Sequence, residues 1–174
     1  MSEINLGIIG GGQLGSLLSV AAKKLNIKTT IYSDDPDAPA QNFSDDFVFG
    51  NYNDKKKILE FINKVDLITY EFENIPFDTL NEINKLKKVL PKPSVNRLIQ
   101  HRLAEKDFVN KLNIRTTRYV SIEKKSDIET LEDFLPGILK TTTMGYDGKG
   151  QYPIKKITDL DNLNLDFSKG YVLE

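Results

Sequence analysis

The sequence predicts an α/β domain built on a parallel sheet, followed by a smaller α+β domain. Over residues 1–92 short apolar runs alternate with helical patterns, which is typical of right-handed βαβ crossovers that cover both faces of a parallel sheet. A glycine-rich turn joins the first strand to the first helix. Over residues 93–174 short strands follow one another around a second glycine-rich loop, and this mixed pattern indicates an α+β arrangement.

The first domain begins with residues 4–9, INLGII, an apolar run that ends at glycines and therefore predicts a buried parallel strand. A helix follows, because apolar residues recur there at helical spacing. These residues are Leu14, Leu17, Leu18 and Ala21. Further strands are expected at residues 27–33, 46–49 and 65–71, where β-branched and aromatic residues gather.

Two more helices and a last strand complete this domain. Asn53 is expected to cap a helix over residues 54–64, and Pro76 opens the next helix. Residues 88–91, KVLP, predict a fifth strand that proline stops. The apolar residues that share one helix face are Ile58, Phe61 and Ile62, and then Leu80, Ile83 and Leu86.

The second domain begins with a helical segment over residues 94–112, and another helix is expected near 126–134. The inward residues of the first segment are expected to be Leu98, Leu103, Phe108 and Leu112. Short strands are predicted near residues 117–121, 137–141, 151–155 and 171–174.

The composition excludes several classes of protein. A net charge of −1 gives no bulk electrostatic reason to bind nucleic acid or an anionic membrane. The absence of cysteine excludes disulfides and thiolate metal sites and fits a reducing compartment. No apolar run approaches the roughly 20 residues that span a bilayer, and the acidic start at residues 1–3 is unlike a signal peptide. We therefore expect a cytoplasmic globular protein with no nucleic-acid or membrane partner.

The end of the sequence, GYVLE at residues 170–174, has the pattern of a strand that has just begun. We expect the sequence to be the amino-terminal part of a longer protein. The alternative is an edge strand that closes a compact domain.

The first glycine loop is a weak functional signal. Gly10, Gly12 and Gly15 form G-x-G-x-x-G between a strand and a helix, where backbone N–H groups attract an anion such as phosphate. Two aspartates, at residues 34–35, end the second strand, where a dinucleotide-binding protein has its ribose-binding acid. The loop alone therefore favours NAD or FAD, and the alternatives are another phosphate-bearing ligand or a tight turn without a ligand. Gln13 lies where a bound ligand would meet it.

The rest of the sequence argues against a nicotinamide enzyme. Hydride transfer needs a group that polarises a carbonyl or alcohol, commonly a histidine. The only histidine is His101, within a polar helical run, and a histidine in that setting is expected to be solvated.

An acidic segment, TYEFENIP at residues 69–76, follows the fourth strand at the edge where open parallel sheets bind ligands. In an extended chain the spacing of Glu71 and Glu73 turns both carboxylates to one side. An isolated acidic pair commonly lies on the solvent-exposed surface and has no function of its own. Beside a phosphate-binding loop, this pair favours binding of an amine or hydroxyl group on a phosphorylated substrate.

The stretch MGYDGKGQ, residues 144–151, predicts a glycine-rich hairpin between a strand that ends in Lys140 and a strand that begins at Gln151. Such a loop folds over a polyphosphate, with backbone N–H groups and a lysine neutralising charge. It lacks the G-x-x-x-x-G-K-[ST] pattern of a P-loop, and the alternative is an ordinary turn. Tyr146, Asp147 and Lys149 add chemistry that suggests contact with a second substrate.

Together these stretches resemble the ATP-grasp superfamily, and within it the ligases that carboxylate an imidazole ribonucleotide in purine biosynthesis. The matching stretches occur in the family's order: GIIGGGQLG, DPDAP, DLITYEFENIP, HRLAEKDFVNKLNI and GYDGKGQ. The resemblance implies a Rossmann-like preATP-grasp domain at residues 1–92 and the first part of an ATP-grasp domain at 93–174. It also implies ATP-dependent carboxylation of aminoimidazole ribonucleotide by bicarbonate, Mg²⁺ with ligands beyond residue 174, and a homodimer. This stretch alone is expected to be inactive.

The resemblance also assigns residues. Nucleotide contacts are expected from Arg102, Lys140, Gly145, Tyr146, Asp147, Gly148, Lys149, Gly150, Gln151 and Glu174. Contacts to the ribonucleotide are expected from Gly12, Gln13, Leu14, Glu73, Tyr146, Asp147 and Lys149. The expected catalytic residues are Tyr146, Asp147 and Lys149, with Asp147 orienting or deprotonating the substrate amine.

Two residues depart from the family pattern, because Met144 stands where a glycine is usual and Thr142 where a basic residue is frequent. The alternatives are ATP-grasp ligases of the formate-dependent glycinamide ribonucleotide transformylase or biotin carboxylase type. Two further alternatives for the function are a nicotinamide oxidoreductase and a non-catalytic nucleotide-binding module.

Overall fold

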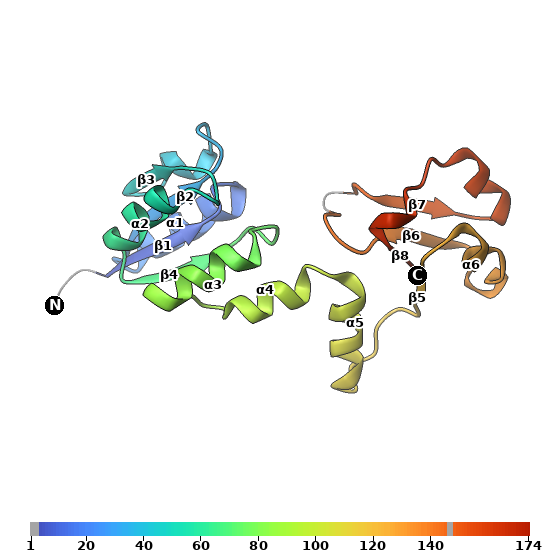
Figure 1. Ribbon diagram of the computed structural model, residues 1–174. Helices are drawn as coiled ribbons and strands as arrows, with labels where there is room; N and C mark the ends of the chain where they lie inside the picture. The colour runs from blue at the N-terminus through green and yellow to red at the C-terminus, as the bar shows by residue number, and fades with distance from the viewer. Residues whose placement is uncertain (1–3, 146–147) are drawn as a thin grey trace. The chain divides into compact units, whose positions relative to one another are not determined.

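The computed structural model describes residues 4–145 and 148–174. The chain forms two compact units, Met1–Arg97 and Leu98–Glu174 (Figure 1). In the part that the structure describes, no helix has the length and apolar character needed to cross a membrane.

The first unit contains a parallel four-stranded sheet in the order β3-β2-β1-β4, so the predicted α/β class is confirmed. Its strands are β1 Asn5–Ile9, β2 Lys28–Ser33, β3 Asp46–Phe49 and β4 Leu67–Tyr70. Its helices are α1 Gln13–Lys24, α2 Lys55–Lys64 and α3 Phe77–Leu86, with a 3-10 turn η1 Pro39–Asn42, and α4 Pro93–Ile99 contains the boundary between the two units.

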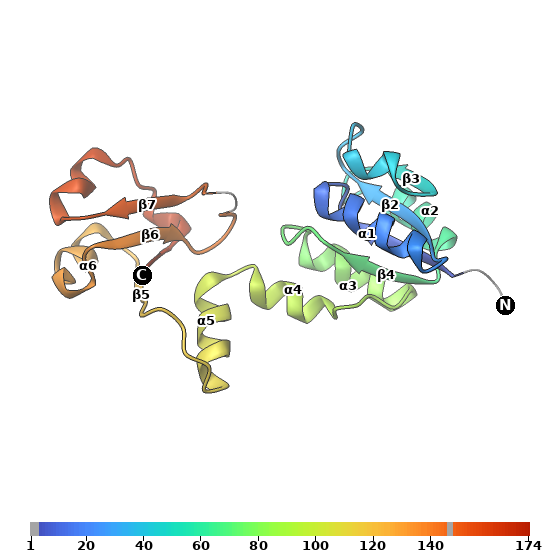
Figure 2. The same ribbon diagram turned by 180° about the vertical axis from the view of Figure 1, so that it is seen from behind.

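Successive residues of the central strand β1 face opposite sides of this sheet and so belong to two separate hydrophobic clusters, and helical elements lie over both faces (Figures 1 and 2). Ile9 belongs to a large cluster with Phe61 of α2 and Leu80 of α3. Ile8 points the other way, into a smaller cluster with Ala40 of η1. The strands are therefore covered on both sides, as buried parallel strands must be.

Helix α1 buries a different face from the one its apolar pattern suggests. Leu14 and Leu17 are exposed, whereas the buried residues of the helix are Gly15, Ser16, Ser19 and Ala22. A side chain on Gly15 would approach the Gly10 carbonyl oxygen to 2.7 Å, so small residues are what let this helix lie close to the loop after β1.

The predicted fifth strand at residues 88–91 is reduced to a single parallel bridge between Ile68 and Val89. Two backbone hydrogen bonds support it, from the Ile68 N–H to the Lys88 carbonyl and from the Leu90 N–H to the Ile68 carbonyl, at 3.0 and 2.9 Å. Pro91 has no N–H to extend the pairing.

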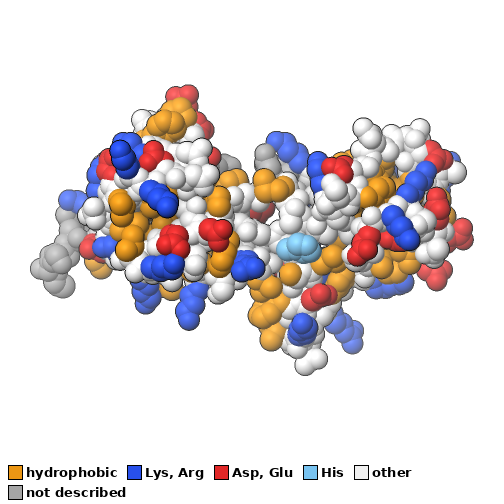
Figure 3. All heavy atoms as spheres, viewed as in Figure 1, with side chains coloured by type: hydrophobic (Ala, Val, Ile, Leu, Met, Phe, Trp, Pro, Cys, Tyr) orange, Lys and Arg blue, Asp and Glu red, His pale blue; other side chains and the backbone are white. Residues whose placement is uncertain are grey.

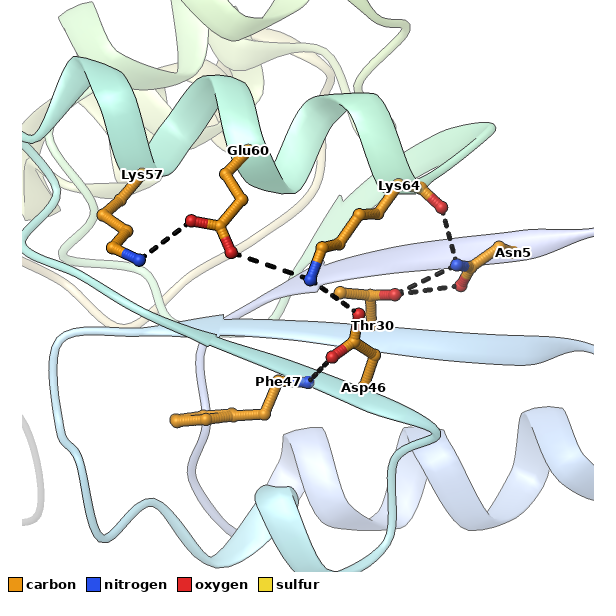
Figure 4. Close-up of polar contacts among 7 residues, drawn as sticks. All are labelled: Asn5, Thr30, Asp46, Phe47, Lys57, Glu60 and Lys64. Carbon is orange, nitrogen blue, oxygen red and sulfur yellow. Dashed lines mark hydrogen bonds and ion pairs between the residues drawn. The ribbon is translucent and has the colours of Figure 1, made fainter.

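Polar contacts fix α2 across neighbouring strands (Figure 4). The Lys64 ammonium lies 2.9 Å from Asp46 of β3 and 3.7 Å from Glu60. The Asn5 amide of β1 donates to the Lys64 carbonyl at 2.7 Å and to the Thr30 hydroxyl of β2 at 3.0 Å. The end of α2 is thus joined directly to β3 and β1, and Asn5 links this contact to β2.

The N-cap of α2 is Asp54, so the expected cap at Asn53 is wrong by one residue. The Asp54 carboxylate accepts hydrogen bonds from the Lys56 and Lys57 N–H groups at 3.0 and 3.1 Å, whereas the Asn53 N–H donates to the Asn51 side chain. Asp54→Ala is expected to lower the free energy of unfolding by about 1 kcal/mol. Asn53→Ala is the control, and urea unfolding that finds the larger loss at Asn53 would contradict the assignment.

The second unit contains an antiparallel sheet in the order β5-β8-β6-β7, which confirms the α+β pattern. Its strands are β5 Val120–Ile122, β6 Gly137–Thr141, β7 Gln151–Ile154 and β8 Tyr171–Leu173. Its helical elements are α5 Arg102–Lys111, α6 Lys125–Glu129 and the 3-10 turns η2 Glu132–Phe134, η3 Ile157–Asn162 and η4 Phe167–Lys169.

The helical segment expected over residues 94–112 is two helices, α4 and α5. His101 separates them as the N-cap of α5, and its Nδ1 atom accepts from the Ala104 N–H at 3.4 Å. The imidazole therefore has a structural contact that its pattern did not predict. Phe108 and Leu112 are exposed, so the expectation that they face inward is wrong.

Candidate functional site

The predicted glycine-rich hairpin is present in the second unit. Strands β6 and β7 pair with Lys140 opposite Gln151, and the Thr141 N–H donates to the Gly150 carbonyl at 2.8 Å. Gly148 and Gly150 have φ angles of 80° and 68°, in the left-handed region that glycine adopts readily. These glycines are therefore required by the turn itself.

Two glycines of the hairpin are also closely packed. A Cβ atom on Gly150 would lie 2.5 Å from the Thr141 hydroxyl oxygen, and one on Gly145 would lie 3.0 Å from the Arg102 guanidinium. At Gly148 no atom would lie within 4 Å. The base of the hairpin therefore has no room for a side chain, whereas Gly148 has.

Met144 stands where the family pattern has glycine, and its φ angle is 58° with the side chain 68% exposed. A residue with a Cβ atom is strained there. Met144→Gly is expected to raise the free energy of unfolding by about 0.5–1 kcal/mol, since relief of strain exceeds the added chain entropy. The control is Thr143→Gly, which relieves no strain and is expected to destabilise; equal effects of the two in urea unfolding would contradict this reading.

Helix α5 holds the base of the hairpin through Arg102. The guanidinium donates from Nε to the Thr141 carbonyl at 3.1 Å and from Nη2 to the Gly145 carbonyl at 2.9 Å. The Arg102 N–H donates to the Thr142 carbonyl at 2.8 Å. Arg102 thus adjoins the predicted phosphate loop, and its contact with nucleotide remains a prediction.

A charge cluster lies beside the hairpin where the sequence predicted two separate nucleotide contacts. The Lys140 ammonium is 2.9 Å from one Glu174 carboxylate oxygen, and the Lys106 ammonium is 2.8 Å from the other. The side chains of Lys106, Lys140 and Glu174 are only 16%, 19% and 10% exposed. Burial favours the protonated acid, but hydrogen bonds and charge from both lysines outweigh it and lower the pKa of Glu174.

Lys106 was missed by sequence reasoning. The signal that could have found it is its spacing, because it lies four residues after Arg102 and therefore on the same face of α5. Of the other expected loop residues, Lys149 is exposed and Gln151 begins β7. Tyr146 and Asp147 lie outside the described residues.

In the first unit, the anion-binding position of the glycine loop is filled by the chain's own carboxylate. Glu71 accepts from the Gly12 N–H at 3.1 Å, and a Cβ atom on Gly10 would lie 2.8 Å from the same carboxylate. Gly12, the N-cap of α1, has no side chain to cap the helix. Glu71 therefore supplies the negative charge that a helix N-terminus attracts.

Burial raises the pKa of Glu71 above its ordinary value of 4.5, although hydrogen bonds from the Gly12 and Gly15 N–H groups oppose the rise. The folded state therefore holds this proton more tightly than the unfolded state does. The stability that this group contributes is complete below pH 4.5 and is lost as pH rises through the raised pKa. Glu71→Gln keeps an oxygen acceptor and removes this loss, so its stability relative to wild type should increase between pH 4 and pH 7. Urea unfolding at both pH values measures this; a constant difference would contradict it.

The predicted ribonucleotide contacts of the first unit follow the carboxyl ends of β1 and β4. Gly12, Gln13 and Leu14 are exposed at the start of α1. Glu73 is exposed in the turn after β4, and its carbonyl accepts from the Asn96 amide at 2.9 Å. Strand β4 ends at Tyr70 and Glu73 lies in the turn that follows. Of the two glutamates, Glu71 contacts the glycine loop.

The groups that a dinucleotide site would use are engaged within the first unit. Glu71 occupies the glycine loop, and burial together with the nearby charge of Asp34 raises the pKa of the Tyr52 hydroxyl. Asp35 accepts from the Asp37 N–H at 2.9 Å, within its own turn. This arrangement disfavours the nicotinamide alternative.

On the face shown in Figure 3, basic and acidic side chains are interspersed over both units. Among residues 4–145 and 148–174, no group of three His, Cys, Asp or Glu side chains is arranged to hold a metal ion.

Comparison with known proteins identifies both parts of the chain. A family model described as the ribonucleotide synthetase preATP-grasp domain matches residues 1–100. A model of the ATP-grasp domain matches residues 107–173. The first match alone covers more than half of the chain.

Individual proteins that match the chain in sequence or structure have names consistent with these two family models. The chain is 34% identical to the N5-carboxyaminoimidazole ribonucleotide synthase of Aquifex aeolicus (strain VF5), over 98% of this chain and 46% of that protein. It is 36% identical to the Bacillus subtilis (strain 168) enzyme of that name, over 90% of this chain and 42% of that protein. The crystal structure of N5-carboxyaminoimidazole synthetase from Staphylococcus aureus complexed with ADP matches 98% of this chain and 47% of that one, with 31% identity and a TM-score of 0.88. The chain thus spans less than half the length of these relatives.

Proposed function

The chain belongs to the ribonucleotide synthetase preATP-grasp family, and on that basis we propose that it contributes to an ATP-dependent ligase that carboxylates 5-aminoimidazole ribonucleotide. The observation that carries the proposal is the hairpin of β6 and β7, with Lys140 at its base, in a chain similar to an ADP-bound synthetase. We also propose domain limits of 1–92 and 93–174. The activity belongs to the complete enzyme that contains this chain.

In the proposed reaction a bicarbonate oxygen attacks the γ-phosphorus of ATP, and ADP leaves. The resulting carboxyphosphate delivers carbon dioxide to the exocyclic amine of the ribonucleotide and releases phosphate. This chain's part is to bind and orient: Lys140 and Arg102 neutralise phosphate charge, and the hairpin N–H groups hold phosphate oxygens. Closure of the hairpin would shield the labile intermediate from water.

The acceptor is proposed to bind in the first unit, where Gly12, Gln13, Leu14 and Glu73 are exposed at the carboxyl edge of the sheet. Tyr146, Asp147 and Lys149 are proposed to contact it from the hairpin. Asp147 would orient or deprotonate the amine, which predicts that Asp147→Asn slows carboxylation.

Mg²⁺ is proposed as the cofactor of the complete enzyme, but the described residues do not fit a metal site. No acidic cluster is present among them, and Glu174 is already paired with two lysines. The Mg²⁺ ligands are therefore proposed to come from other parts of the complete enzyme. A cytoplasmic location and a homodimer are part of the same proposal.

Phosphate release by the complete enzyme tests the proposed function. Release is expected to require ATP, bicarbonate and aminoimidazole ribonucleotide together, and the omission of any one should reduce it to background. Release with glycinamide ribonucleotide and formate in place of aminoimidazole ribonucleotide and bicarbonate would favour the formate-dependent ligase, and release with biotin in place of aminoimidazole ribonucleotide, bicarbonate being kept, would favour the biotin carboxylase type. Binding of NADH without binding of ATP would contradict the proposal.

A further inference from the structure

The cluster of Lys106, Lys140 and Glu174 has more lysines than its carboxylate needs. Each ammonium contacts a different oxygen of Glu174, at 2.8 and 2.9 Å. Because all three side chains are largely buried, the charges interact more strongly than they would in water. Two cations and one anion leave one net positive charge beside the hairpin, which suits a polyanionic ligand.

Lys106 is held independently of Lys140. It projects from α5, one helical turn beyond Arg102, and its ammonium lies 5.2 Å from the centre of the Tyr119 ring. The Tyr119 hydroxyl donates to Asp107 at 2.6 Å and accepts from the Asn110 amide at 3.1 Å. Movement of Lys140 on its strand therefore leaves the contact between Lys106 and Glu174 in place.

The proposed function, on which this inference rests, requires Lys140 to turn toward nucleotide phosphate. Glu174 would then lose one of its two partners while it remains buried. A buried carboxylate without a partner is strongly destabilising. The second lysine removes that obstacle, because Glu174 stays paired throughout.

We propose that Lys106 is a positioning residue that keeps Glu174 ionised and in place while Lys140 is transferred to the phosphates of ATP. Lys106 itself need not touch the nucleotide. Its contribution appears only when phosphates draw Lys140 away from Glu174. Binding of ATP should therefore depend on Lys106, and binding of adenosine, which has no phosphates, should not.

Calorimetric titration of the complete enzyme with ATP and with adenosine tests this inference. Lys106→Met is expected to weaken ATP binding about 10-fold and to change adenosine binding by less than about 2-fold. Lys106→Arg should restore ATP binding to within about 3-fold of wild type, because it keeps the charge. Lys111→Met is the matched control on the same helix and should change neither. If Lys106→Met does not fold, Lys106→Gln removes the same charge from a side chain that still packs.

A double-mutant cycle separates positioning from a merely structural role. In a Glu174→Gln background there is no charge for Lys106 to hold, so Lys106→Met should then change ATP affinity by less than about 2-fold. The inference would be overturned if Lys106→Met weakened ATP and adenosine binding equally, or weakened ATP binding equally with and without Glu174→Gln. Binding of ATP by the wild-type enzyme would still support the proposed function in that case. Wild-type enzyme that does not bind ATP would contradict both.

Discussion

Replacement of Gly150 by alanine in the complete enzyme is expected to lower kcat/KM for ATP about 100-fold. The added Cβ atom would lie 2.5 Å from the Thr141 hydroxyl oxygen, at a φ angle of 68°. The clash falls where Thr141 and Gly150 are joined by a backbone hydrogen bond of 2.8 Å, so the hairpin must shift at its base. A displacement of about 1 Å of groups that position a reacting phosphate costs a factor of this size.

Gly148→Ala provides a matched control for that prediction. Gly148 has a φ angle of 80°, so alanine is strained there too, but its Cβ atom would meet nothing within 4 Å. The control should lower kcat/KM less than about 10-fold, since it adds strain of about 1–2 kcal/mol without a clash. Equal effects of the two substitutions would show that packing at the hairpin base does not matter.

Lys140→Met is expected to lower kcat/KM for ATP by about 100- to 1,000-fold, the range found when a preorganised group that stabilises developing charge is removed. The substitution removes the ammonium group that β6 carries at the start of the hairpin and leaves Glu174 with Lys106 alone. Steady-state kinetics with varied ATP measures the effect, and Lys140→Arg should recover part of the activity because it keeps the charge.

Lys155→Met tests whether loss of any lysine in this unit has the same effect. Lys155 is exposed just after β7, and its loss should leave kcat/KM unchanged within about 2-fold, because exposed charges contribute little. If Lys140→Met retains wild-type activity, Lys140 takes no part in phosphate binding.

Much of the fold was predictable because the apolar runs typical of buried strands and the apolar spacing typical of helices are both clear in this sequence. The run at residues 4–9 and the helical patterns after it indicated a parallel sheet that the structure confirms. The buried face of helix α1 was harder to predict, because its exposed leucines recur at the same helical spacing that buried apolar residues normally show. The structure shows that the buried side is the one with small residues, where Gly15 lies close to the Gly10 carbonyl. The break at His101 depends on a cap that spacing alone does not indicate.

The sequence indicated which residues belong to the candidate site, but not which of them form ion pairs or hydrogen bonds with one another. The hairpin, Lys140 and Glu174 were each predicted as nucleotide contacts, but the ion pairs that join Glu174 to Lys140 and Lys106 depend on strand register. Likewise the sequence indicated an acidic pair beside the glycine loop. The turn that begins after Tyr70 determines that Glu71, rather than Glu73, contacts Gly12.

Hydrogen exchange of the complete enzyme, with and without MgATP, tests most directly whether the hairpin N–H groups bind the phosphates of ATP. Peptides that cover residues 141–151 should exchange more slowly when MgATP is bound, because phosphate oxygens would then accept from their N–H groups. Adenosine, which lacks phosphates, should leave that exchange unchanged. Exchange in 141–151 that is the same with saturating MgATP as without it would contradict the account.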